Sequence, residues 1–188
     1  MKKVRFILVG CGAIGERHAR LAAEKGELVA VCDIDERKAK AFSKTYSCFG
    51  YTSLNDMLRQ VVADALLVCT PNGLHAEHSI AGLHHHLHVL CEKPMAISSA
   101  DGKRMIQAAV KANRHLLIVK QNRFNPPVAA VKKLLQSKKL GKIYSIQLNC
   151  FWNRGAKYYQ QSDWRGTKAM DGGVLFTQFS HFIDLLYW

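Results

Sequence analysis

Long apolar runs, acidic side chains and paired cysteines are all scarce in this sequence. No stretch approaches the roughly 18 uncharged apolar residues of a membrane span, and residues 1–6 are too charged for a signal peptide. We therefore predict a cytoplasmic protein with no membrane partner. Asp and Glu number 14 against 27 Lys and Arg, which gives a formal net charge of +13. Such an excess predicts a phosphate-bearing partner without identifying it.

The cysteines and histidines lack the regular spacing of a metal site. No Cys-x-x-Cys pair occurs among Cys11, Cys32, Cys48, Cys69, Cys91 and Cys150. They are predicted to be small buried thiols in a reducing compartment rather than disulfides or zinc ligands. His84, His85 and His86 are consecutive, so a helix cannot direct all three to one ion. We predict no metal, with a histidine-bound ion as the alternative.

The first two thirds of the chain alternate between apolar runs and helical patterns. Strands are predicted at 4–9, 28–32, 65–69, 88–91 and 116–119, and helices near 16–25, 36–45, 75–86 and 98–113. Strands that are apolar at consecutive positions and separated by helices indicate a parallel sheet covered on both faces. The predicted fold class is therefore α/β, with a Rossmann-type doubly wound parallel sheet.

A second pattern begins after Asn125-Pro126-Pro127. Proline in a first turn predicts a basic helix over 128–137, and alternation of side chains over 143–151 predicts a strand of a second sheet. An apolar helix is predicted over 173–188, and it carries no stop signal. We expect the doubly wound Rossmann-type domain at 1–122 and, at 123–188, the beginning of an α/β domain with a mixed, mainly antiparallel sheet. The sequence is thus expected to be a piece of a longer protein that forms homo-oligomers through this second domain.

A glycine-rich turn joins the first predicted strand to the first helix. Its six residues are Gly10, Cys11, Gly12, Ala13, Ile14 and Gly15. In a GxGxxG loop the glycines allow a tight turn, close approach of a pyrophosphate and close packing of helix on strand. Asp33 follows the second strand, 18 residues after Gly15, where a carboxylate can accept from a ribose 2′-hydroxyl. We predict NAD as the cofactor; Arg37 and Lys38 keep NADP as the alternative.

A charged pair follows the predicted strand at 88–91. Pro94 stiffens the segment after Glu92 and Lys93, and the carboxyl edge of an open α/β sheet is where ligands bind. Lys93 is therefore placed beside the nicotinamide, where an ammonium can stabilise a developing alkoxide. The alternative is a solvated loop lysine.

GCGAIG, TPNGLH and CEKPMA, in that order and spacing, resemble the Gfo/Idh/MocA family of NAD(P)-dependent sugar oxidoreductases. The resemblance extends along essentially the whole chain. It implies that Lys93 is catalytic. It also implies cofactor contacts from strand-end and loop residues, to which we assign Thr70, Pro71, Asn72, His75, Glu92 and Asn122.

A polar stripe crosses the predicted closing helix. Thr177, His181 and Asp184 are spaced at i, i+4 and i+7 and so share one face. By pattern alone His181 is better explained as a satisfied structural histidine. The family resemblance implies instead that His181 acts with Lys93 as the acid-base group. Thr177 stands where the family commonly has an aspartate, and we count it as a catalytic candidate.

Several flanking segments resemble the branch of the family that oxidises UDP-N-acetylglucosaminuronic acid at C3 in bacterial surface-polysaccharide synthesis. A uronate and a diphosphate call for guanidinium donors. Substrate contacts are therefore predicted for Lys93, Arg123, Arg154, Trp164, Arg165, Thr177 and His181.

The same sequence features fit other functions. An oxidoreductase acting on inositol or a free sugar fits the same motifs. A non-catalytic dinucleotide-binding regulator would need neither Lys93 nor His181, so their joint presence favours an enzyme. The basic run 132–142 lacks interleaved aromatic residues and a known reading module, so we predict no nucleic-acid partner.

Overall fold

The computed structural model describes residues 3–188, and its largest element is one six-stranded parallel sheet. The strands are β1 (Arg5–Val9), β2 (Glu27–Cys32), β3 (Phe49–Tyr51), β4 (Ala65–Val68), β5 (His88–Cys91) and β6 (Leu116–Ile118). Their order is β3-β2-β1-β4-β5-β6, with every neighbouring pair parallel. The predicted doubly wound fold is confirmed. Strand order reverses between β1 and β4, and ligands of such sheets bind at the carboxyl edge of that point.

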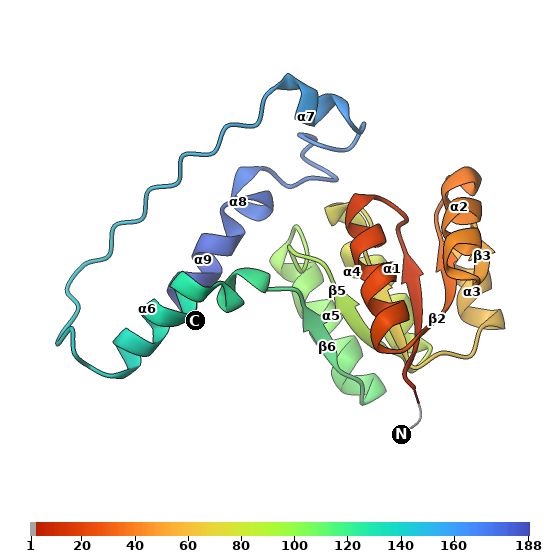
Figure 1. Cartoon of the computed structure of the whole chain (residues 1–188), viewed down its shortest axis with the longest axis horizontal. Coiled ribbons are helices and arrows are strands. Elements are labelled where there is room, and N and C mark those ends of the chain that lie inside the picture. Colours follow the sequence, from red (N-terminus) through yellow and green to blue (C-terminus); the bar gives the residue numbers. More distant parts are fainter. Residues whose placement is uncertain (1–2) are drawn as a thin grey trace.

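Helices cover both faces of this sheet (Figure 1). They are α1 (Ala13–Lys25), α2 (Glu36–Tyr46), α3 (Leu54–Gln60), α4 (His75–His84) and α5 (Ser99–Ala112). Leu8, Val31 and Leu67 pack in one core cluster with α1 and α2, whereas Ile7 and Leu66 pack in the other with α3, α4 and α5. Sequence reasoning missed β3 and α3, because a three-residue strand with an exposed phenylalanine and a seven-residue helix carry little periodic signal.

The remaining elements are short. They are the 3-10 turns η1 (Asn72–Leu74) and η2 (Gln121–Phe124) and the helices α6 (Pro126–Gln136), α7 (Ala156–Gln160), α8 (Val174–Thr177) and α9 (Ser180–Tyr187). Proline opens α6 at its first turn, as the sequence predicts. Figure 1 shows α9 beside α6, and α8 between α9 and the segment that carries α7.

The strand predicted over 143–151 is not formed. Within residues 3–188 this segment pairs with no other strand, and in Figure 1 it is an extended arch between α6 and α7. Strands depend on ladder hydrogen bonds to a neighbour. The alternating pattern therefore predicted the extended backbone but not a partner for it.

The single helix predicted over 173–188 is two helices. Its first turn ends at Thr177, where the hydroxyl donates to the Gly173 carbonyl oxygen at 3.1 Å. The chain restarts as α9 at Ser180 after the backbone N–H of Phe179 bonds to Val174 O at 2.9 Å. The prediction of one continuous helix was therefore wrong, and Thr177 and His181 come from successive helices.

Four of the six cysteines are buried, as predicted, while Cys48 and Cys150 are half-buried. Burial raises the pKa of Cys11 to about 12 and that of Cys32 to about 11, so both thiols stay protonated at neutral pH. Across residues 3–188, no helix is long and apolar enough to cross a bilayer, and no group of three or more side chains is arranged to hold a metal ion.

Candidate active site

The glycine-rich loop has the geometry of a phosphate-binding turn. Gly10 has φ +97°, and a Cβ there would lie 2.6 Å from the Cys69 carbonyl oxygen. A Cβ on Gly15 would lie 2.0 Å from Gly10 O, whereas a Cβ on Gly12 would meet no atom within 4 Å. Gly12 caps α1 without a side-chain hydrogen bond. The first turn of the helix is thus open to an anion such as a diphosphate.

Asp33 is held against this loop by backbone donors. Its Oδ2 accepts from the Cys11 N–H at 2.8 Å and its Oδ1 accepts from the Asp35 N–H at 2.9 Å. A carboxylate has about four lone-pair sites, so acceptor capacity remains for a ribose hydroxyl. These features fit a nicotinamide dinucleotide without rearrangement.

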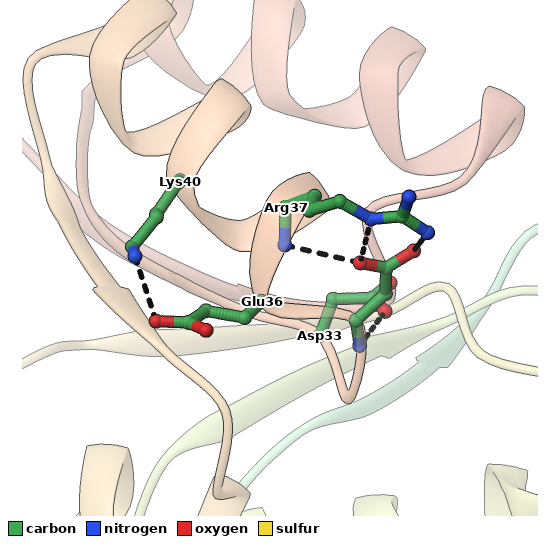
Figure 2. Close-up of polar contacts among 5 residues, drawn as sticks. Asp33, Glu36, Arg37 and Lys40 are labelled. Carbon is green, nitrogen blue, oxygen red and sulfur yellow. Dashed lines mark hydrogen bonds and ion pairs between the residues drawn. The ribbon is translucent and has the colours of Figure 1, made fainter.

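Two of the cations that follow Asp33, Arg37 and Lys40, are already engaged (Figure 2). The Arg37 guanidinium donates from Nε and Nη2 to the two oxygens of Asp35, each at 3.3 Å, and Lys40 lies 2.8 Å from Glu36. Both cations are on the exposed face of α2. Arg37 would have to leave Asp35 to meet a 2′-phosphate, which favours NAD over NADP.

A buried carboxylate connects α1 to the Lys93 loop. Glu92 is 8% exposed; its Oε1 lies 2.7 Å from His18 Nε2, and its Oε2 accepts from the Lys93 N–H at 3.2 Å. Burial acts to raise the pKa of Glu92, but the contacts with His18 and Lys93 outweigh it and leave the pKa lowered. The charged carboxylate therefore holds the cofactor helix and the Lys93 loop together.

Three contacts tie the strand-end loops to the carboxyl-terminal part of the chain. Lys93 Nζ donates to Thr177 O at 2.7 Å, Asn72 Nδ2 donates to Asp171 O at 2.9 Å, and Gly73 N donates to Met170 O at 2.9 Å. Asn72 donates its amide nitrogen to Asp171, and its contact with the cofactor stays a prediction. The side chain thereby aligns the two parts of the site.

A cavity of about 100 Å³ lies between the two parts. Its walls are formed by Asn72, Lys93, Trp152, Arg154, Tyr158, Trp164, Asp171, Thr177, Gln178 and His181. The structure thus brings the predicted residues Lys93, Arg154, Trp164, Thr177 and His181 into one place. Periodicity and motif signals had not identified Trp152, Tyr158, Asp171 or Gln178 as site residues.

Two titratable groups that line the cavity, Lys93 and His181, have perturbed pKa values. Burial lowers the pKa of His181, and the charges of Lys93 and Lys120 lower it further. Burial also lowers the pKa of Lys93, against the opposing charge of Glu92. At neutral pH the imidazole is therefore neutral and can accept a proton, and the neighbouring ammonium is less strongly solvated than a surface lysine.

Two arginine guanidinium groups lie over the ring of Tyr158, which lines the cavity. The Arg154 guanidinium lies 4.6 Å from the ring centroid, and that of Arg165 lies 4.4 Å from it. Arg154 also stacks on Trp152 at 4.4 Å, and its Nε is buried without a hydrogen-bond partner in the described part of the chain. Arg165 donates to Tyr158 O and Gln161 instead and does not line the cavity.

Other predicted residues lie outside the cavity. Arg123 forms a bidentate pair with Asp184 at 2.8 and 2.7 Å, so neither faces the cavity. Asn122 is half-buried in η2. His75 is buried, with both ring nitrogens at backbone carbonyl oxygens, which leaves neither for a cofactor.

The fold and the cavity define a Rossmann-type dinucleotide-binding chain with a lysine and a histidine in one cavity at the carboxyl edge of its sheet. Residues 4–120 match the family model described as "Oxidoreductase family, NAD-binding Rossmann fold", and residues 128–188 match the Gfo/Idh/MocA C-terminal domain. The chain belongs to the Gfo/Idh/MocA family of NAD-binding oxidoreductases, as the motif resemblance predicts.

Two similar solved structures are WlbA dehydrogenases in complex with NADH and UDP-GlcNAcA. The Chromobacterium violaceum protein is 44% identical with a TM-score of 0.96, and the Bordetella pertussis protein is 42% identical with a TM-score of 0.95. Each match covers 100% of this chain and 55% of the other. The glucose-6-phosphate 3-dehydrogenase of Bacillus subtilis is 31% identical over 100% of this chain and 53% of its own length. The chain therefore spans about half the length of these relatives.

Proposed function

We propose that the protein oxidises a secondary hydroxyl of a sugar, with NAD as hydride acceptor. The observation that carries this proposal is the cavity in which Lys93 and His181 meet, at the carboxyl edge of the sheet that bears the glycine-rich loop. Proximity to a dinucleotide site and a lysine-histidine pair together provide what alcohol oxidation requires.

The two side chains have different tasks in this proposal. Oxidation of an alcohol removes a proton from oxygen and a hydride from carbon. Lys93 donates a hydrogen bond to the reacting oxygen and stabilises the developing alkoxide, while His181 accepts the proton. When bound, NAD supplies the electrophilic carbon that takes the hydride. Thr177 supports this arrangement through its carbonyl oxygen, which holds the ammonium at 2.7 Å.

We further propose that the substrate is a UDP-N-acetylglucosaminuronate, oxidised at C3 for surface polysaccharide synthesis. The buried Arg154 Nε lacks a partner in the described residues, and a carboxylate or phosphate on the substrate would satisfy it. Two WlbA structures at 44% and 42% identity contain NADH and UDP-GlcNAcA, which supports the same class of substrate. Arg123 is not part of this proposal because it pairs with Asp184. The Nε of Arg165 also lacks a partner in the described residues, but Arg165 does not line the cavity and is left out for that reason.

The remaining predictions accompany this function. We place the boundary between the dinucleotide-binding and substrate-binding domains at residues 122 and 123. A cytoplasmic location and homo-oligomer formation stay predictions.

A substrate panel tests the proposal. We would follow NADH formation with UDP-GlcNAcA, UDP-GlcNAc, glucose 6-phosphate and myo-inositol at saturating NAD, after confirming NADH binding by fluorescence. Turnover restricted to UDP-GlcNAcA is the expected result, and Arg154→Ala should raise KM for it. Turnover of glucose 6-phosphate or inositol alone would replace the substrate assignment. NADH binding without oxidation of any of the four would contradict the proposed activity of this chain.

A further inference from the structure

His75, the first residue of α4, lies between two loops of the site. It is 1% exposed. Its Nδ1 lies 2.6 Å from Pro94 O and its Nε2 lies 2.9 Å from Thr70 O. Carbonyl oxygens only accept hydrogen bonds, so a neutral ring donates to one of these two carbonyls and packs against the other.

The two carbonyls belong to the segments that shape the cavity. Pro94 is bonded to Lys93, so its carbonyl is two peptide units from the proposed catalytic side chain. Thr70 begins the loop whose Asn72 amide binds Asp171. The imidazole therefore spans the gap between the loop that carries Lys93 and the loop that docks the carboxyl-terminal part of the chain.

We propose that His75 is a positioning residue, which sets the placement of Lys93 by bridging the 70–74 loop to the 92–95 loop, and that it makes no contact with the cofactor. Its kinetic consequence rests on the proposed function. The bridge itself is a property of the fold and can be tested without turnover.

Burial and the charged groups near the ring determine the protonation state of His75, and so the number of hydrogen bonds that it donates. Burial lowers the pKa of His75, while its two carbonyl contacts and Glu92 act in the other direction and Lys93 acts with burial. A neutral imidazole donates only one hydrogen bond. We assign that bond to Nδ1 and Pro94, because this contact is the shorter one.

This assignment distinguishes two conservative variants. An asparagine amide reproduces the position of Nδ1 and can still donate to Pro94 O, whereas a glutamine amide reproduces Nε2 and reaches toward Thr70 O. We would compare His75→Asn, His75→Gln and His75→Ala with the control His78→Ala. His78 lies on the same helix, and its Nδ1 contacts only the Thr70 hydroxyl, at 3.0 Å.

Kinetics give the first readout. A misplaced catalytic group costs up to ~10²-fold in rate, so His75→Ala should lose that order of kcat while KM for NAD and Kd for NADH stay at wild-type values. His75→Asn should recover much of kcat and His75→Gln little. A raised Kd for NADH with unchanged kcat would make His75 a cofactor ligand and overturn the proposal, as would equal kcat in all variants.

Hydrogen exchange of the full chain gives a readout that does not need a substrate. His75→Ala should accelerate exchange in both 70–74 and 92–97, whereas His78→Ala should affect only 70–74. If His75→Ala does not fold, the same comparison is made with His75→Gln. Unchanged exchange in 92–97 would overturn the bridge even if the protein proves to be an active dehydrogenase, and accelerated exchange would support it even without turnover.

Discussion

The dinucleotide-binding region and the region from 123 to 188 differ in the side chains that they bury. In the described part of the chain, every buried apolar side chain lies between Ile7 and Ala112. Beyond residue 122 the buried residues are Asp171, Thr177 and His181, and all three line the cavity. The first region is thus held by its own core, and the second is held to the first through the site.

Large aromatic side chains of the region 123–188 are exposed, whereas the core side chains of the first region are buried. Phe124, Tyr144 and Phe151 are 84%, 85% and 97% exposed, while Leu66 and Met105 in the first region are fully buried. Hydrophobic burial is the main favourable term in folding, so stability and activity should respond to substitutions in different regions. The experiments below test that separation.

The largest effect is expected from Lys93→Met. Loss of the ammonium removes the donor to the developing alkoxide, so kcat should fall about 10³-fold. Kd for NADH should stay at the wild-type value, because the glycine-rich loop and Asp33 are untouched. Single-turnover kinetics and fluorescence titration measure the two quantities, and Lys93→Arg controls for charge. Wild-type kcat in the Met variant would remove Lys93 from the mechanism.

A pair of leucine truncations tests where the core lies. Leu66→Ala empties a fully buried position and should lower the free energy of unfolding by about 3 kcal/mol. Leu135→Ala, at a position 39% exposed in α6, should change it by less than about 0.5 kcal/mol. Urea unfolding followed by circular dichroism compares them. Equal losses would mean that the second region has a core of its own.

Much of this contrast is readable from the sequence. Apolar runs with intervening helical patterns predict five of the six strands, and the glycine-rich loop and Glu-Lys-Pro segment lie at strand ends as expected. Local periodicity carries these features because neighbours in sequence determine them. Thr177 and His181 both line the cavity, although the single helix expected to bring them together is broken between them.

The contacts that sequence reasoning missed join residues far apart in the chain. Asn72 and Asp171 are 99 positions apart, and Arg123 and Asp184 are 61 apart. No local pattern distinguishes an arginine that binds substrate from one that pairs with a distant carboxylate. The alternation at 143–151 predicts an extended segment in the same way, without revealing whether another strand lies beside it.

Asp33→Ala tests whether cofactor binding belongs to the first region alone. Loss of a hydrogen bond to a charged acceptor should weaken NADH binding by about 2 kcal/mol, and the preference over NADPH should narrow. Arg154→Ala, the control in the second region, should leave both Kd values unchanged. Fluorescence titration with NADH and NADPH measures the ratio. A strong preference of the wild-type protein for NADPH would contradict the role given to Asp33.

Asn72→Ala tests the hydrogen bonds that join the two regions. Removal of its hydrogen bond to Asp171 O should cost about 1 kcal/mol and accelerate hydrogen exchange in 164–188. The strands of the sheet should keep their protection, which serves as the internal control. Loss of protection in β4 or β5 would show that the two regions unfold as one unit.

The smallest effect is expected in the pH profile of kcat/KM. His181 must be neutral, and burial lowers its pKa below 6.5, so activity should fall as pH drops through that lowered value. Lys93 must be protonated, and burial lowers its pKa below 10.5, so activity should also fall as pH rises through that value. The profile is therefore bell-shaped. His181→Asn should abolish the acidic limb, and an acidic limb that persists would assign it to another group.

The hydrogen bonds that join the two regions also affect which side chains of the cavity can be replaced. Lys93 Nζ and the Gly73 N–H donate to the backbone oxygens of Thr177 and Met170. Asn72 donates to the backbone oxygen of Asp171 and also, at 3.4 Å, to its carboxylate. Backbone carbonyls are present whatever the side chains are. Side chains that line the cavity, such as that of Thr177, can therefore be exchanged while these backbone contacts are kept.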